Sequence, residues 1–160
     1  MSPSRKPNRL IPRKDAVILG RRLRRSRKRI AFTNGVFDIL HRGHVEYLQA
    51  ARDAGDVLIV GLNTDASVRR LKGPSRPIQP QRDRAAILLA LRAVDFVVMF
   101  GEDTPAKLIR EIRPHVLVKG ADYRLDQIVG ADFVLAQGGE VKRIPLRQGR
   151  SSSSIIKRLS

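Results

Sequence analysis

Apolar residues along this chain gather in short runs that are separated by segments of helical period. DVLIVGLN at 56–63 is almost continuously apolar and predicts a strand buried on both faces of a sheet. RIAFTNG at 29–35 and DFVVMF at 95–100 are compact apolar runs that also predict strands. HVLVKG at 115–120 and VKRIPL at 141–146 predict two more strands.

Helical spacing fills the segments between these strands. Residues 43–55, GHVEYLQAARDAG, place apolar side chains on one helical face and end at a glycine. Pro12 suits an early helical position, and Thr104 beside Pro105 suits a helix start. Further helices are predicted from Pro12 to Arg25 and within 81–94, 104–112, 130–139 and 151–160. The alternation predicts an α/β fold with a parallel five-stranded, Rossmann-like sheet and helices on both faces.

Polar, glycine-containing loops follow the predicted strands. They are NGVFDILHRGH, NTDAS, KGADY and RQGRSSSS. Because ligands of parallel α/β sheets bind beyond the carboxyl ends of the strands, these loops predict a nucleotide site. Lys72 precedes Gly73, Pro74 and Pro77, and this composition predicts a mobile loop.

The first loop carries His41 and His44 around Gly43. Gly35 and Gly43 permit close approach of a ligand to the backbone, and the following helix N-terminus attracts phosphate. The two rings are expected on one side, where their N–H groups can donate to phosphate oxygens. A zinc site, or simple packing and helix capping, remains an alternative; zinc would need a further ligand, and His115 is the remaining histidine.

Composition narrows the class of protein. The 160 residues suit one domain, and the absence of cysteine excludes disulfides and thiolate metal sites. No apolar run approaches the roughly 20 residues of a membrane span, and no signal peptide is recognised. We therefore expect a soluble, cytoplasmic protein that does not enter a membrane.

The net charge of +17 is concentrated at the N-terminus. Residues 1–29 contain 12 Lys and Arg and one acid, and residues 30–160 contain 20 and 14. This predicts a basic N-terminal segment with a helix, 1–29, before a catalytic domain, 30–160. The segment leaves nucleic-acid binding open, although no aromatic side chain in it could stack on bases.

The ordered blocks of the sequence resemble the nucleotidyltransferase superfamily with the H-x-G-H signature, here HRGH. FTNGVFDILHRGHVEYL, GLNTDASVRRLKGPSRPI, LRAVDFVVMFGEDTP, VLVKGADY and GGEV carry the resemblance, which extends from about residue 11 to 160. Within the superfamily, it is strongest to the heptose 1-phosphate adenylyltransferases. No sugar-kinase domain accompanies the match.

This resemblance implies a reaction and its partners. ATP and D-glycero-β-D-manno-heptose 1-phosphate would give ADP-heptose and pyrophosphate, for surface lipopolysaccharide, with Mg²⁺ carried by the triphosphate rather than by a dedicated protein site. LRAVDFV at 91–97 resembles a dimer segment of the family, so a homodimer is expected. Cytidylyltransferases for glycerol 3-phosphate or ethanolamine phosphate and FMN adenylyltransferases stay open as alternatives.

The resemblance also implies roles for single residues. His41, His44 and Lys72 match catalytic positions. Asp65, Arg84 and Arg92 match positions near the acceptor. Nucleotide-binding positions are matched by Gly35, Val36, Phe37, Asp38, Lys119, Gly120, Asp122, Ser151, Ser152 and Ser153. The serine turn departs from the usual Ser-Thr-Thr, and Ala121 stands where glycine is common.

Overall fold

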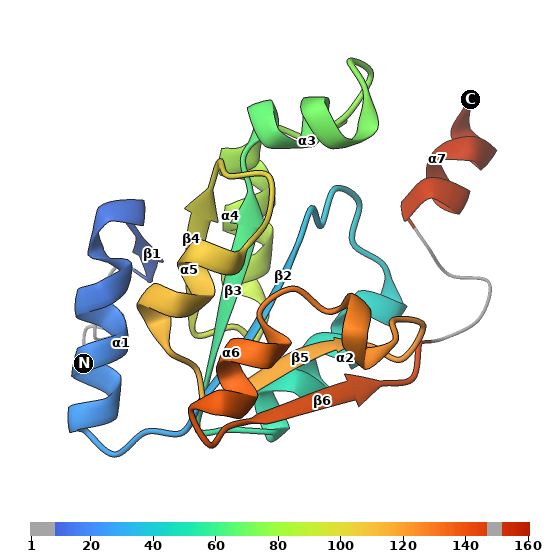
Figure 1. The fold of residues 1–160 in the computed structure, drawn as a ribbon. Coiled ribbons are helices and arrows are strands. Elements are labelled where there is room, and N and C mark those ends of the chain that lie inside the picture. Colours follow the sequence, from blue (N-terminus) through green and yellow to red (C-terminus); the bar gives the residue numbers. More distant parts are fainter. Residues whose placement is uncertain (1–8, 147–151) are drawn as a thin grey trace, which may run out of the picture.

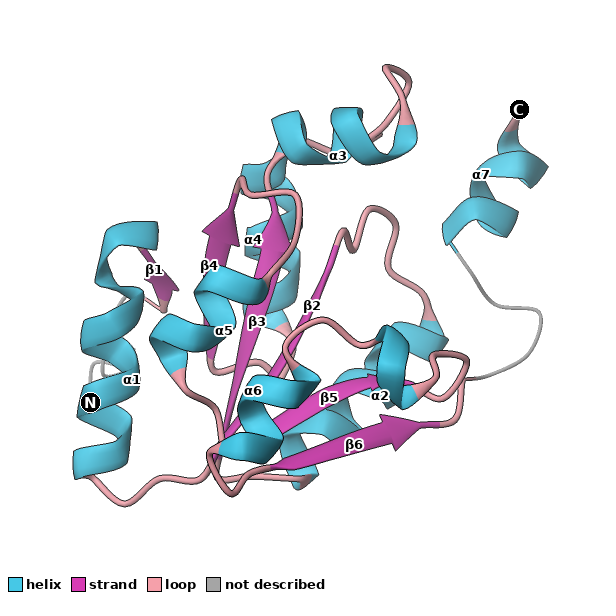
Figure 2. Ribbon diagram, viewed as in Figure 1, coloured by secondary structure: helices cyan, strands magenta, loops and turns pink. Residues whose placement is uncertain are grey.

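The computed structural model describes residues 9–146 and 152–160, and places six parallel strands in one sheet (Figures 1 and 2). The strands are β1 (Leu10–Ile11), β2 (Ile30–Gly35), β3 (Val57–Asn63), β4 (Phe96–Phe100), β5 (Val116–Gly120) and β6 (Glu140–Ile144). Their order is β1-β4-β3-β2-β5-β6. The sequence predicted five strands and missed β1, which is only two residues long and pairs with β4.

Helices α1 to α6 lie between successive strands of the chain, and α7 follows β6. They are α1 (Ala16–Arg25), α2 (Arg42–Asp53), α3 (Asp65–Lys72), α4 (Gln81–Ala90), α5 (Ala106–Ile112), α6 (Ala131–Ala136) and α7 (Ser152–Leu159), with 3-10 turns at Arg13–Asp15 and Leu125–Gln127. No helix within the described ranges is both long and apolar enough to cross a membrane.

Alternation along the central strands builds a hydrophobic core on each face of the sheet. Ile30 and Phe32 of β2 face one layer with Ile59 of β3, where α1, α5 and α6 pack. Ala31 of β2 and Val60 of β3 face the opposite layer, which α2 and α4 cover. Strands buried on both faces explain why their sequences are almost continuously apolar.

The order in which strands are added to the sheet reverses at β2. β3 and β4 follow on one side of β2, whereas β5 and β6 lie on the other. β2 pairs with β3 over six residues but with β5 only at Ala31–Val116 and Phe32–Leu117. Beyond Phe32 the two strands separate, and this opens a crevice at the carboxyl edge of the sheet, the usual place for a ligand.

Candidate active site

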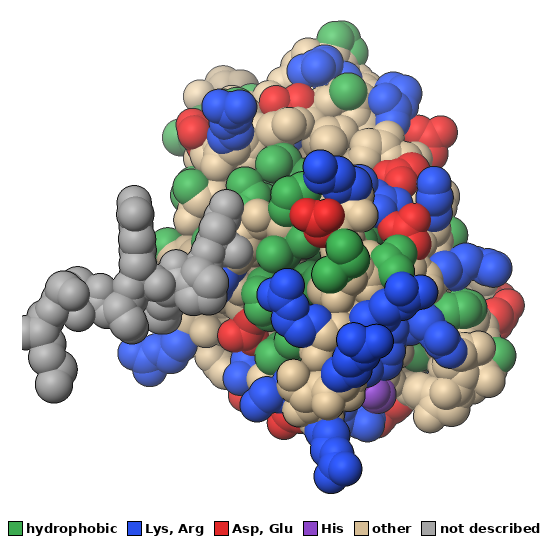
Figure 3. Space-filling model, turned by 90° about the vertical axis from the view of Figure 1, so that its left-hand side faces the viewer, with side chains coloured by type: hydrophobic (Ala, Val, Ile, Leu, Met, Phe, Trp, Pro, Cys, Tyr) green, Lys and Arg blue, Asp and Glu red, His purple; other side chains and the backbone are tan. Residues whose placement is uncertain are grey.

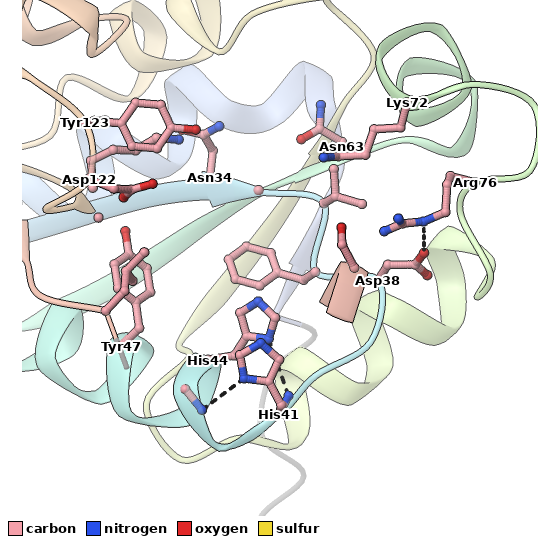
Figure 4. Close-up of a pocket in the computed structure, with 18 residues that line it drawn as sticks. Asn34, Asp38, His41, His44, Tyr47, Asn63, Lys72, Arg76, Asp122 and Tyr123 are labelled. Carbon is pink, nitrogen blue, oxygen red and sulfur yellow. Dashed lines mark hydrogen bonds and ion pairs between the residues drawn. The ribbon is translucent and has the colours of Figure 1, made fainter. Parts of the chain in front are cut away.

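A pocket of about 430 Å³ occupies the crevice between β2 and β5 (Figure 4). It is lined by the loop after β2, the start of α2, the end of α3, and the loop after β5. The lining residues are Asn34, Gly35, Val36, Phe37, Asp38, His41, Gly43, His44, Tyr47, Asn63, Lys72, Arg76, Lys119, Gly120, Asp122, Tyr123, Leu146 and Ser153. Most of the residues that the sequence singled out therefore meet at this pocket.

Phe37 shapes the loop that leads from β2 to α2. Its backbone is left-handed, with φ of 48°, which is uncommon for a residue with a side chain. The ring lies edge-on to His44, with 5.4 Å between ring centroids. A Cβ at Gly35 would lie 2.9 Å from the same ring, so glycine at this position gives Phe37 its place.

His41 and His44 form a reciprocal cap at the N-terminus of α2. Nδ1 of His41 accepts the Gly43 N–H at 3.1 Å, and Nδ1 of His44 accepts the His41 N–H at 3.4 Å. Their ring centroids are 4.0 Å apart. Capping, which the sequence left open as an alternative, is thus present, and it satisfies donors that a helix start leaves without intrahelical partners.

The caps also determine where each ring holds its proton. An Nδ1 atom that accepts a hydrogen bond is unprotonated, so a neutral ring in this arrangement has its proton on Nε2. Burial, together with the neighbouring His41, lowers the pKa of His44 to about 4. At neutral pH, His44 is therefore an uncharged Nε2–H donor beside the helix N-terminus.

The third histidine is remote from this pair. His115 precedes β5, and its Nδ1 accepts the Ile30 N–H at 2.9 Å at the amino edge of the sheet. Among residues 9–146 and 152–160, no three His, Cys, Asp or Glu side chains gather as a metal site. The geometry gives no support to a zinc site built on His41, His44 and His115.

Asp38 connects the loop after β2 with the segment before α4. Its buried carboxylate accepts the amide N–H groups of Ile78 and Gln79 and pairs with Arg76 at 2.8 Å. Burial opposes ionisation, but these donors outweigh it and lower the pKa of Asp38. Asp38 lines the pocket, and its carboxylate oxygens accept the hydrogen bonds that hold these two loops together.

Arg84 is fully buried and joins four segments beneath the pocket. Its guanidinium donates to the carbonyls of Val36 at 2.7 Å, Asn63 at 2.9 Å and Gln79 at 3.0 Å, and pairs with Asp65 at 2.7 Å. Neither Arg84 nor Asp65 lines the pocket. The structure places both residues beneath the pocket with their charges paired, and their predicted role near the acceptor stays a prediction.

Arg92 is also away from the pocket. It lies exposed in the turn between α4 and β4. Because this turn precedes a parallel strand, it lies at the amino edge of the sheet, opposite the pocket. The structure thus places Arg92 away from the pocket, and its expected role near an acceptor stays a prediction.

The loop after β5 contributes charge and an aromatic ring. Nζ of Lys119 lies 5.0 Å from the Tyr123 ring centroid. Burial lowers the pKa of Lys119, and the charge of Asp122 partly opposes that shift. A Cβ at Gly120 would lie 2.5 Å from Oδ1 of Asp122, so a side chain at this position would displace the Asp122 carboxylate.

The sequence predicted Lys72 in a mobile loop, but the structure places it as the last residue of α3. Thr64 caps this helix by accepting the Ser67 N–H at 3.3 Å, which the prediction of a loop at 63–67 overlooked. Of the three serines, Ser153 lines the pocket and Ser152 opens α7, whereas Ser151 lies outside the described residues.

Tyr47 is a pocket residue that the sequence reasoning missed. Its hydroxyl lies 2.8 Å from the Thr33 hydroxyl on β2 and donates to the Val118 carbonyl on β5 at 3.2 Å. It thus spans the crevice where the two strands separate, and burial raises its pKa to about 12. The spacing of three residues from His44, on the same helical face, was the available signal.

Five further lining residues were not named as site residues, although three of them lie in the predicted loops: Asn34, Asn63, Arg76, Tyr123 and Leu146. Two of them follow directly from strand ends, which offered a signal. Asn34 belongs to the end of β2, and Asn63 ends β3. Arg76 depends on its contact with Asp38, and no local pattern reveals that contact.

Comparison with known proteins places the chain beside nucleotide-handling enzymes. The model of a family described as cytidylyltransferase-like matches residues 32–158. Bifunctional protein HldE of Nitrobacter winogradskyi is 62% identical over 130 residues, which are 81% of this chain and 27% of that protein. HldE of Magnetococcus marinus is 56% identical over 133 residues, 83% of this chain and 27% of that protein. The chain thus spans about a quarter of the length of these relatives.

Solved structures agree with the fold. The lipopolysaccharide core biosynthesis protein of Thermoplasma volcanium has a TM-score of 0.62 and 29% identity, covering 77% of this chain and 99% of that one. Pantoate-beta-alanine ligase of Francisella tularensis has a TM-score of 0.61, covering 94% of this chain and 74% of that one. At 17% identity, this second likeness shows the fold alone.

Proposed function

We propose that this chain, which belongs to the cytidylyltransferase-like family, transfers AMP from ATP to D-glycero-β-D-manno-heptose 1-phosphate and releases pyrophosphate. The observation that carries the proposal is the His41–His44 cap, which presents two histidines at a helix N-terminus inside the crevice. The heptose acceptor is supported by the resemblance of the sequence blocks and by the HldE relatives.

The chemistry requires little from a base. An oxygen of the sugar phosphate attacks the α-phosphorus of ATP, and the bond to the bridging oxygen of the leaving pyrophosphate breaks. A phosphate monoester is already a nucleophile, so positioning and charge stabilisation carry most of the acceleration. The Nε2–H groups of His41 and His44 donate to the α-phosphate oxygens as negative charge builds on them.

The surrounding residues bind the two ends of the nucleotide. Gly35, Val36 and Phe37 bring backbone close to the triphosphate, and the Lys72 ammonium reaches the β- and γ-phosphates from the end of α3. Lys119, Gly120 and Asp122 contact the base. The Ser153 hydroxyl adds a donor for phosphate, and the resemblance implies the same role for Ser151 and Ser152. Mg²⁺ would be bound as part of the ATP complex, where it would supply positive charge to the leaving pyrophosphate.

A homodimer is part of the proposal. Residues 91–97 resemble a dimer segment, and the exposed Arg92 lies in the same stretch at the amino edge of the sheet. An interface at this edge would leave the pocket at the carboxyl edge open to substrates.

Product analysis tests the proposed function. The full chain is incubated with ATP, Mg²⁺ and the heptose 1-phosphate, and the products are identified by mass spectrometry. We expect ADP-heptose and pyrophosphate in equal amounts. Free AMP with unconsumed sugar phosphate would mean that water is the acceptor, and it would contradict the proposal.

A further inference from the structure

A row of cations covers the exposed side of α1. Ala16, Leu19, Gly20 and Leu23 face inward, and α1 packs against α5. Ile18, Arg21, Arg22 and Arg25 follow at helical spacing on the outside and line one shallow surface with Ser26. Lys14 before the helix and Arg27 and Lys28 after it are exposed as well, and we count them with these arginines as the basic face.

The cations of the basic face are not neutralised by neighbouring acids. Arg13 pairs with Glu102 and Glu111, and Arg29 pairs with Glu140 at 2.9 Å. Within the described parts of the chain, by contrast, Arg21, Arg22 and Arg25 form no ion pair. Figure 3 views this side of the molecule and shows blue side chains gathered with few red ones among them.

The basic face is separate from the pocket. α1 lies at one side of the sheet in Figure 1, whereas the crevice lies between β2 and β5. The family match begins at residue 32, after α1 has ended. The arginines therefore have no part in the proposed transfer reaction.

We propose that the basic face of α1 docks the protein on an anionic phospholipid surface. Arg21, Arg22 and Arg25 on one helical face, with exposed cations before and after the helix, match a layer of lipid phosphates, which attract each Lys or Arg independently. Ile18 lies at one end of the arginine row and is 54% exposed, so its hydrocarbon side chain can enter the boundary between headgroups and acyl chains. The pocket would remain open to solvent.

Ile18 favours a bilayer over a nucleic acid. Contact with a phosphate backbone gains nothing from an exposed aliphatic side chain, since that binding comes from released counterions. The segment 1–29 also contains no aromatic residue on which a base could stack. A membrane surface uses both the charges and the apolar side chain of this face.

Co-sedimentation of the full chain with vesicles tests the proposal. We expect binding to vesicles of phosphatidylcholine mixed with phosphatidylglycerol, and none to phosphatidylcholine alone. The triple variant Arg21→Gln, Arg22→Gln, Arg25→Gln should lower the partition coefficient about 100-fold, or about fivefold for each arginine. The matched triple Arg69→Gln, Arg82→Gln, Arg124→Gln has the same net charge, alters exposed arginines elsewhere, and should stay within a few fold of the unmodified chain.

Comparing vesicle binding with RNA binding, and one triple variant with the other, distinguishes a membrane surface from a nucleic-acid surface and from attraction to net charge. Ile18→Gln should weaken vesicle binding and leave binding to a single-stranded RNA oligonucleotide unchanged. Equal losses in both triple variants would show attraction to net charge only and would overturn the proposal. Binding to RNA without binding to anionic vesicles would overturn it in favour of a nucleic-acid surface. ADP-heptose formation by the soluble chain is measured separately, so failure here leaves the proposed reaction standing.

Discussion

At the level of single residues, His41 and His44 each use Nδ1 to accept a backbone N–H of the α2 N-terminus. From the sequence, capping and phosphate chemistry competed as explanations of their spacing. The structure makes them compatible, because the cap uses Nδ1 and the proposed chemistry uses Nε2. Residue spacing shows neither which ring nitrogen is engaged nor which is left to carry the proton.

Replacing His41 by asparagine separates the two tasks. Asn is a good N-cap and can accept the Gly43 N–H, but it has no atom at the position of Nε2. We predict that His41→Asn keeps its melting temperature and loses about 100-fold in turnover, the loss typical of one transition-state donor. His41→Ala should lose both. Near-normal turnover of folded His41→Asn would contradict the donor role.

The depressed pKa of His44 gives the stability a pH dependence. In the unfolded chain the ring has a pKa near 6.5, whereas in the folded protein its pKa is about 4. As the pH falls from about 6.5 to about 4, the unfolded state gains a proton that the folded state does not, so the free energy of unfolding decreases. Denaturation curves of the wild type and of His44→Gln, compared between pH 4 and 7, isolate this contribution. Parallel pH profiles would contradict it.

At the level of elements, the strands were the most predictable part of the chain. The apolar runs gave β2 to β6 within about one or two residues, because burial on both faces leaves a strong local signal. β1 was missed, since its two residues are a strand only through β4. α3 was missed because the glycine and prolines after Lys72 indicate a loop, and the cap at Thr64 was not recognised as a helix start.

Arg84 shows what local patterns cannot reveal. A charged residue on a helix is ordinarily exposed, yet this one is 1% exposed and holds three carbonyls and Asp65. We predict that Arg84→Lys destabilises the fold by about 3 kcal/mol. A single ammonium cannot reach all the acceptors that the planar guanidinium binds, so buried oxygens are left unpaired.

The matched control is Arg82→Lys, an exposed arginine on the same helix, α4. It should change the free energy of unfolding by less than about 0.5 kcal/mol. Both values come from urea denaturation. An Arg84→Lys variant as stable as Arg82→Lys would show that the hydrogen bonds of Arg84 contribute nothing.

At the level of the whole molecule, the predicted architecture is confirmed apart from the sixth strand, and the pocket lies at the predicted edge. The positions of single side chains relative to the pocket could not be predicted, because they depend on contacts between residues far apart in the sequence. Asp65, Arg84 and Arg92 follow the sequence pattern of the family, but two are paired beneath the pocket and the third lies at the opposite edge.

The proposed homodimer has a direct physical test. Sedimentation equilibrium should give a mass of about twice the 17.9 kDa of the chain. The variant Arg92→Glu reverses this charge in both copies, so it would repel any acidic side chain that Arg92 meets across the interface and should shift the equilibrium toward single chains. A mass of 17.9 kDa at every concentration of the unmodified protein would contradict the dimer.

The central claim is that this site transfers AMP to a heptose 1-phosphate. The most direct test is the rate of pyrophosphate release by the full chain, with ATP or CTP crossed against heptose 1-phosphate, glycerol 3-phosphate and FMN. We predict that kcat/KM is highest, by at least about 100-fold, for ATP with heptose 1-phosphate. Turnover of CTP with glycerol 3-phosphate, without turnover of ATP with heptose 1-phosphate, would contradict the account.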